Sequence, residues 1–105
     1  MPLRGRKLGL LLSAPPDQPN FRRALRLAEA ALQAGSAVYL YCIDEAVTGL
    51  EDSQLQSLKA RGLILYACAY AARRRNIPLN DLATFAGLSV VSDLMAGTDR
   101  FLSFN

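Results

Sequence analysis

Three stretches of the chain are almost continuously apolar and have the length of buried strands. They cover residues 7–13 (KLGLLLS), 37–43 (AVYLYCI) and 63–67 (LILYA). A strand that is buried on both faces gives a run of this kind, without the alternation of a half-exposed strand. Valine, isoleucine and tyrosine in the second run also favour a strand. The pattern therefore predicts three strands in the interior of a sheet.

A helical pattern lies between the first two apolar runs. Asn20 is of the residue type that caps a helix start, and Gly35 suits the position just after a helix end. Between them, apolar residues recur at steps of three and four, while polar residues fill the other positions. The apolar set is Phe21, Leu25, Ala28 and Leu32. The spacing predicts a helix from Asn20 to about residue 34.

Shorter elements continue the alternation in the second half of the chain. We expect a helix at 51–60 that ends before Gly62, and an alanine-rich helix at 68–75 that stops before Pro78. The remaining predicted elements are a strand at 82–85, a helix at 92–96 capped by Ser92, and a strand at 101–104. Strands that alternate with helices form parallel β-α-β units. The sequence therefore predicts a layered α/β fold, and its 105 residues predict a single domain over 1–105.

The composition argues against several classes of protein. With 51% hydrophobic and 20% charged residues, the chain is too apolar to be disordered, and none of its apolar runs reaches the ~20 residues that span a bilayer. Histidine is absent, which removes Ser-His-Asp catalysis and histidine metal sites. The net charge of +3 is mild, and the glycines form no phosphate-binding motif. We expect no metal, no cofactor, no nucleic acid and no membrane among its partners.

The start of the chain has some features of a secretory leader. Arg4, Arg6 and Lys7 precede the first apolar run, but that run is short, and Pro15 and Pro16 follow it in place of a small-residue cleavage site. A buried first strand is the better interpretation. The two cysteines are too few for a disulfide scaffold and suit a reducing compartment. We therefore expect a cytoplasmic protein.

Cys68 is the strongest candidate for a reactive group. Sites in open parallel sheets form beyond the carboxyl ends of the strands, and Cys68 follows the third predicted strand directly. Its thiol is expected near the free N–H groups of Ala69 and Tyr70 at the start of the next helix. A helix start favours anions, so these amides would stabilise a thiolate or a persulfide anion. The alternative is that Cys68 is a small core residue without chemistry.

Cys42 and Ser13 end the other two predicted strands at the same edge. Cys42 lies inside an apolar run, so a buried core thiol is the favoured interpretation. The alternative is a second thiol that faces Cys68 and relays sulfur, although the sequence contains no CxxC motif. Ser13 is a further candidate for a pocket or for stabilising a persulfide.

Charged residues near the element ends have structural explanations. Asp44 and Glu45 are expected to cap the helix that follows, with a general base pair or metal ligands as the alternative. The three arginines at 73–75 suit the negative end of a helix dipole. Their alternative role is contact with nucleic acid or with an acidic partner.

The sequence resembles the DsrE/DsrF/TusD-like sulfur-relay family over nearly its whole length. Residues 58–77 (LKARGLILYACAYAARRRNI) give a leucine-bearing helix, a glycine, an apolar strand, a cysteine and a small-residue helix with basic residues. Residues 85–104 (FAGLSVVSDLMAGTDRFLSF) are similar to the ending of the same family. The loops after the first and second predicted strands are shorter than in many relatives, and the first is rich in proline.

The resemblance implies a flavodoxin-like three-layer sandwich with a mostly parallel five-stranded sheet and helices on both faces. It also implies assembly into trimers or hexamers, and a cysteine persulfide that carries sulfur between a donor and an acceptor protein. On this sequence the sulfur-bearing position is Cys68, and Cys42 has no transferable role. The leading hypothesis is therefore a sulfur carrier of sulfurtransferase type. The alternatives are a non-enzymatic oligomeric interaction module, and a binder of small ligands or nucleotides with a flavodoxin-like shape.

Overall fold

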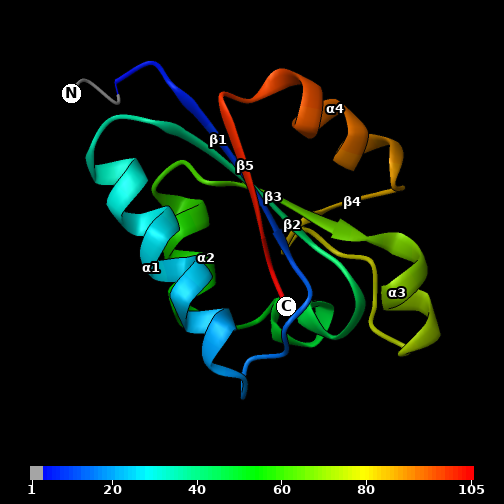
Figure 1. Ribbon diagram of the computed structural model, residues 1–105. Coiled ribbons are helices and arrows are strands. Elements are labelled where there is room, and N and C mark those ends of the chain that lie inside the picture. Colours follow the sequence, from blue (N-terminus) through cyan, green and yellow to red (C-terminus); the bar gives the residue numbers. More distant parts are fainter. Residues whose placement is uncertain (1–3) are drawn as a thin grey trace.

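Five strands form one parallel sheet in the computed structural model, which describes residues 4–105 (Figure 1). The spatial order is β4-β3-β2-β1-β5, and every neighbouring pair is parallel. The strands are β1 (Lys7–Leu12), β2 (Ala37–Cys42), β3 (Ile64–Cys68), β4 (Thr84–Ala86) and β5 (Arg100–Phe104). The predicted α/β fold is confirmed, and each predicted strand lies within two residues of an observed one.

Helices connect successive strands and cover both faces of the sheet, as expected. They are α1 (Pro19–Gln33), the 3-10 helix η1 (Asp44–Gly49), α2 (Ser53–Ala60), α3 (Ala69–Arg74) and α4 (Ser89–Gly97). Figure 1 shows α1 and α2 on one face, with α4 on the other. Helix α3 lies at the carboxyl end of β3, where it packs against η1.

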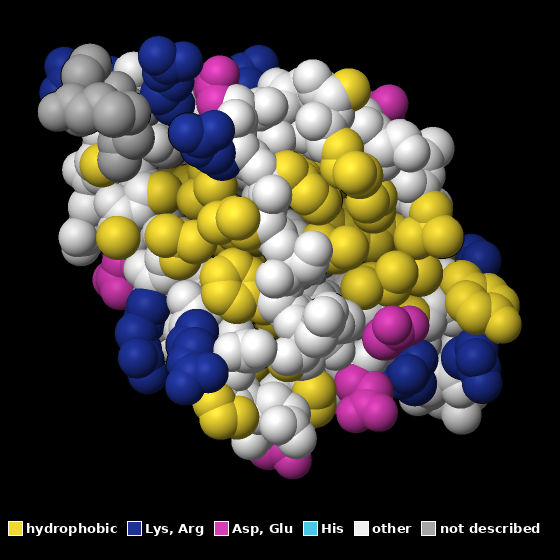
Figure 2. All heavy atoms as spheres, viewed as in Figure 1, with side chains coloured by type: hydrophobic (Ala, Val, Ile, Leu, Met, Phe, Trp, Pro, Cys, Tyr) yellow, Lys and Arg dark blue, Asp and Glu magenta, His cyan; other side chains and the backbone are white. Residues whose placement is uncertain are grey.

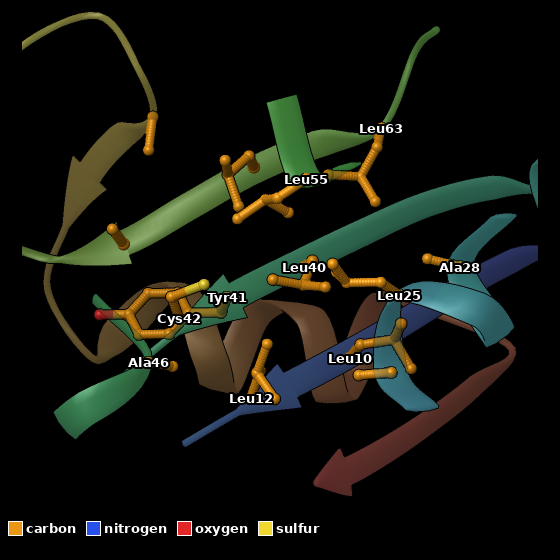
Figure 3. Close-up of a cluster of buried hydrophobic side chains, with 14 of the residues drawn as sticks. Leu10, Leu12, Leu25, Ala28, Leu40, Tyr41, Cys42, Ala46, Leu55 and Leu63 are labelled. Atoms are coloured by element: carbon orange, nitrogen blue, oxygen red, sulfur yellow. The ribbon is translucent and has the colours of Figure 1, made fainter. Parts of the chain in front are cut away.

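The main hydrophobic core fills the layer between the sheet and α1. Leu10 of β1 and Leu40 of β2 are register partners, and both are fully buried together with Leu25 and Ala28 of α1 (Figure 3). Burying a leucine side chain stabilises a fold by about 1.5–3 kcal/mol relative to leaving it exposed. The opposite face is less completely covered, since its apolar residues Leu11, Tyr39, Tyr66 and Phe101 are only half-buried.

The first helix starts earlier than the sequence predicts. It begins at Pro19 after Gln18, because a proline has a φ suited to the first helical turn and lacks one N–H group that would otherwise be unpaired there. Asn20 is therefore not the cap, and its side-chain amide donates to the backbone oxygen of Asn105 at 2.8 Å. The predicted helix end is confirmed, since Gly35 has a φ of +91°, which glycine adopts without steric cost.

Two other predicted caps are also wrong. Asp44 and Glu45 lie in the first turn of η1 and no side chain caps that helix, whereas Asp52 caps α2 by accepting from the amide of Leu55 at 3.1 Å. Helix α4 begins three residues before Ser92. Its first amides bond to carbonyl groups in a backbone turn at 87–88, so the helix starts without a polar cap.

Candidate functional site

Cys68 is both the last residue of β3 and the N-cap residue of α3. Its Sγ accepts a hydrogen bond from the amide of Ala71 at 3.4 Å. From the sequence, the amides of Ala69 and Tyr70 were expected to lie near the thiol instead. The side chain of an N-cap residue reaches the second or third amide of a helix, which explains why the donor is Ala71. The expected contact between the thiol and a helix start is present, through an amide further along the chain.

The Cys68 thiol is covered in this conformation. The residue is 5% exposed, and η1 packs against both β3 and α3 around it. The residues of the short loop after β2 form η1, in which Ala46 and Val47 are buried. A partner could reach the sulfur only after a local movement at this edge of the sheet.

Tyr41 of β2 lies on the same face of the sheet as Cys68, and in the sequence its residue type indicated only a strand. Its side chain is fully buried, and its hydroxyl donates to the backbone oxygen of Ala86 at 2.9 Å. Burial raises the pKa of Tyr41, and the interaction of its hydroxyl with the Cys68 thiol raises that pKa further. No pattern in the sequence indicates this pairing, because it depends on how β2, β3 and β4 are aligned.

Cys42 lies on the other face of the sheet from Cys68. Its register partner on β3 is Ala67, one residue before Cys68, and successive strand side chains point to opposite faces. Both cysteines are free thiols, and they do not face each other as the relay alternative required. Cys42 is fully buried, and this burial raises its pKa to about 12. Cys42 therefore has the surroundings of a buried core thiol, which is the interpretation that the sequence favoured.

Ser13 is not brought to Cys68. Its hydroxyl donates to the side-chain oxygen of Asn105 at 3.0 Å and lies 3.4 Å from the backbone oxygen of Phe104. It therefore sits between the ends of β1 and β5, and β2 separates β1 from β3 in the sheet. The structure gives Ser13 a contact with the end of the chain and none with the cysteine.

The surface of α3 carries an exposed aromatic residue and basic side chains. Tyr70 is 67% exposed, and the guanidinium carbon of Arg74 lies 5.7 Å from the centre of its ring. Arg75 donates to the backbone oxygen of Ala71 at 3.1 Å, so one arginine satisfies a carbonyl near the helix end, as predicted. Arg73 and Arg74 are exposed and available to a partner.

Two hollows lie away from the thiol. An open groove of about 610 Å³ lies at the amino ends of β1 and β5, where Leu8 and Leu102 meet α1. A smaller hollow of about 230 Å³ lies beneath α4, with Tyr39 and Tyr66 on the sheet side. The groove is at the opposite end of the strands from Cys68.

Within residues 4–105, no three His, Cys, Asp or Glu side chains form a group that could hold a metal ion. In the same range, none of the helices has the length and hydropathy that a membrane span requires.

A parallel α/β sandwich with a cysteine at a strand-to-helix junction is the arrangement that the sequence resemblance predicted. The model of the DsrE/DsrF-like family matches residues 6–104, and the chain belongs to this family, which is associated with sulfur relay. A comparison with curated proteins found no match.

Among solved structures, the chain is similar to the crystal structure of the ychN protein from E. coli. The TM-score is 0.78 at 21% sequence identity, over 95% of this chain and 99% of the other. At that identity the likeness establishes the fold, a flavodoxin-like α/β sandwich.

Proposed function

We propose that the chain works as a single α/β domain that carries sulfane sulfur on Cys68. A persulfide on a donor protein would supply the sulfur, and a thiol on an acceptor protein would remove it. The observation that supports this role is the contact of Cys68 Sγ with the Ala71 amide, in a chain of a family associated with sulfur relay. An N–H group aimed at the sulfur stabilises negative charge on it.

The transfer consists of two thiol exchanges and needs no cofactor. The Cys68 thiolate attacks the outer sulfur of a donor persulfide, R–S–SH. An S–S bond forms on Cys68, the donor S–S bond breaks, and the donor leaves as R–S⁻. An acceptor thiolate then attacks the outer sulfur of Cys68–S–SH and releases the Cys68 thiolate. Each step transfers one sulfur atom without net oxidation.

Donor and acceptor must uncover the thiol, because Cys68 is 5% exposed. Helix α3 follows Cys68 directly and exposes Tyr70 and two arginines. We propose that partners with an acidic surface dock on α3 and displace η1, so that the Ala71 amide stays in contact with the sulfur. Oppositely charged surfaces mainly raise the rate of such an encounter. We also propose that the protein works in the cytoplasm, where a thiol such as that of Cys68 stays reduced.

Mass spectrometry after incubation with a persulfide donor tests the assignment. A gain of about 32 Da, one sulfur atom as thiol exchange requires, is expected on the peptide that contains Cys68. The gain should persist in Cys42→Ala and disappear in Cys68→Ser. Cys68 that stays unmodified, while an exposed thiol in the same mixture becomes persulfidated, would count against the proposal.

The burial of both cysteines favours a second candidate, an interaction module in which the two thiols only fill the core. This candidate predicts that Cys68 stays unreactive toward small alkylating agents in the folded protein. It also predicts that Cys68→Ala leaves partner binding intact. A pull-down with that variant and the alkylation rate of the wild-type protein together separate the two candidates.

We also propose that the protein forms a homo-oligomer, such as a trimer or hexamer. Hydrophobic side chains gather on both sides of the edge strand β5 (Figure 2). Leu88, which precedes α4, Met95 of α4 and Leu102 of β5 are 58%, 60% and 43% exposed. Exposed apolar groups that cluster in this way are typical of a contact surface. Light scattering during size-exclusion chromatography measures the mass in solution, and a monomer at micromolar concentration would refute the assembly.

A further inference from the structure

The side chain of Tyr41 crosses the strand that carries Cys68. Tyr41 belongs to β2, yet its hydroxyl bonds to the carbonyl oxygen of Ala86 on β4 at 2.9 Å. Since neighbouring strands lie about 4.8 Å apart, the side chain must pass over β3 to reach β4. Figure 3 shows its hydroxyl pointing away from the leucine cluster of the core.

The strand register sets the point at which Tyr41 crosses β3. Tyr41 is paired with Tyr66, two residues before Cys68, so the side chains of Tyr41 and Cys68 lie on the same face. Ala86, which accepts the hydrogen bond, is the register partner of Cys68 on β4. The register therefore places the hydroxyl beside Cys68, and the interaction between the two groups is one cause of the raised pKa of Tyr41.

The hydroxyl can bind the sulfur in either protonation state. A phenol has one proton to donate and two lone pairs that accept. When Cys68 is a thiol, the proton of Tyr41 goes to Ala86, and the phenol oxygen can accept the S–H proton. When the sulfur is an anion it has no proton, so a hydrogen bond between these two side chains requires the tyrosine as the donor. Rotation about the C–O bond would turn the proton of Tyr41 from Ala86 to the sulfur.

We infer that Tyr41 is a positioning residue that switches its hydrogen bond from Ala86 to Cys68 when the sulfur becomes negatively charged. The amide of Ala71 would then hold the anion from α3, and the hydroxyl of Tyr41 would hold it from β2. The raised pKa of Tyr41 fits this role, because the phenol keeps its proton while the thiolate is present. For the persulfide anion the inference rests on the proposed function, whereas for the thiolate it stands alone.

The pH dependence of Cys68 alkylation tests the switch without any sulfur transfer. Tyr41→Phe removes the hydroxyl and keeps the ring. A hydrogen bond to a charged group is strong enough to move the midpoint of the rate profile up by about one pH unit. Alkylation at pH values below the midpoint should then be about tenfold slower. Tyr39→Phe is the matched control, because Tyr39 lies on the same strand and face, two residues earlier.

The profile separates this role from a structural one. Altered packing or exposure changes the plateau rate at high pH, whereas loss of the donor moves the midpoint. A midpoint in Tyr41→Phe equal to that of wild type would overturn the inference. The persulfide experiment can fail while the midpoint still moves, so failure of the proposed function and failure of this inference are distinguishable.

A second measurement applies if Tyr41→Phe does not fold. In protein labelled with 3-fluorotyrosine, one fluorine resonance should shift with the same midpoint as Cys68 alkylation. That shift should be absent in Cys68→Ala, which also assigns the resonance to the tyrosine beside Cys68. Fluorine resonances that all stay constant through the alkylation midpoint would refute the switch.

Discussion

The two thiols should differ strongly in reactivity, because they lie on opposite faces of the sheet in different surroundings. Cys42 is fully buried, whereas Cys68 is 5% exposed at the carboxyl end of β3 and caps the six-residue helix α3. Iodoacetamide reacts only with the thiolate, so the rate for each cysteine depends on its ionisation and on access. We expect Cys68 to be alkylated through local opening while Cys42 stays protected.

The protection of Cys42 can be worked out from its raised pKa. With a pKa of about 12, Cys42 is about one part in 10⁴ thiolate at pH 8, whereas an unfolded cysteine is about one quarter thiolate. Ionisation alone therefore slows Cys42 by roughly 10³-fold relative to the same residue in the unfolded chain. Steric cover adds to this factor. The residual rate should rise tenfold per pH unit up to about pH 12, provided that the fold persists.

Peptide mapping by mass spectrometry follows both cysteines over a range of pH. Cys42→Ala and Cys68→Ala each leave one thiol and show whether the two act independently. Protein unfolded in urea provides the reference, in which both should react at similar rates. If native Cys42 reacted as fast as Cys68, or within tenfold of its own unfolded rate, the assignment of Cys42 to the sealed core would be wrong.

Two further predictions concern the parts of the fold that hold the site in place. The bond from Arg22 lowers the pKa of Asp52, so the Asp52 carboxylate stabilises the fold above its unfolded pKa, and this contribution disappears as the pH falls through the lower folded value. Asp52→Asn can still cap α2, and it should lower the free energy of unfolding by about 1 kcal/mol at pH 7 and by much less at pH 2. Urea unfolding at both pH values measures this loss, and an equal loss at the two values would contradict the prediction. Gly49→Ala should cost about 1–3 kcal/mol, because its Cβ would lie 2.6 Å from Pro16 Cγ and 2.7 Å from Phe21 Cε2. The control Gly97→Ala meets nothing within 4 Å and should be neutral or slightly stabilising in thermal melts, so equal losses in the two variants would refute the packing argument.

The sequence by itself determined the order and type of the elements and the place of Cys68 along the chain. Apolar runs and helical spacing are local patterns, and they gave all five strands. The end of α1 at Gly35 was also local, since that position needs a positive φ. Helix starts were harder to predict, because backbone turns at α4 and a proline at α1 replaced the polar side chains that the sequence offered as caps.

Only the tertiary structure decided which of the candidate residues meet. Cys42 and Cys68 both end strands, yet an offset of one residue between β2 and β3 sends their side chains to opposite faces. The same register places the hydroxyl of Tyr41 beside Cys68 and Ala86. The strand order places Ser13 beside the end of β5, away from Cys68. Register and strand order arise from pairing between segments that are far apart in the chain, so no local pattern of residues contains them.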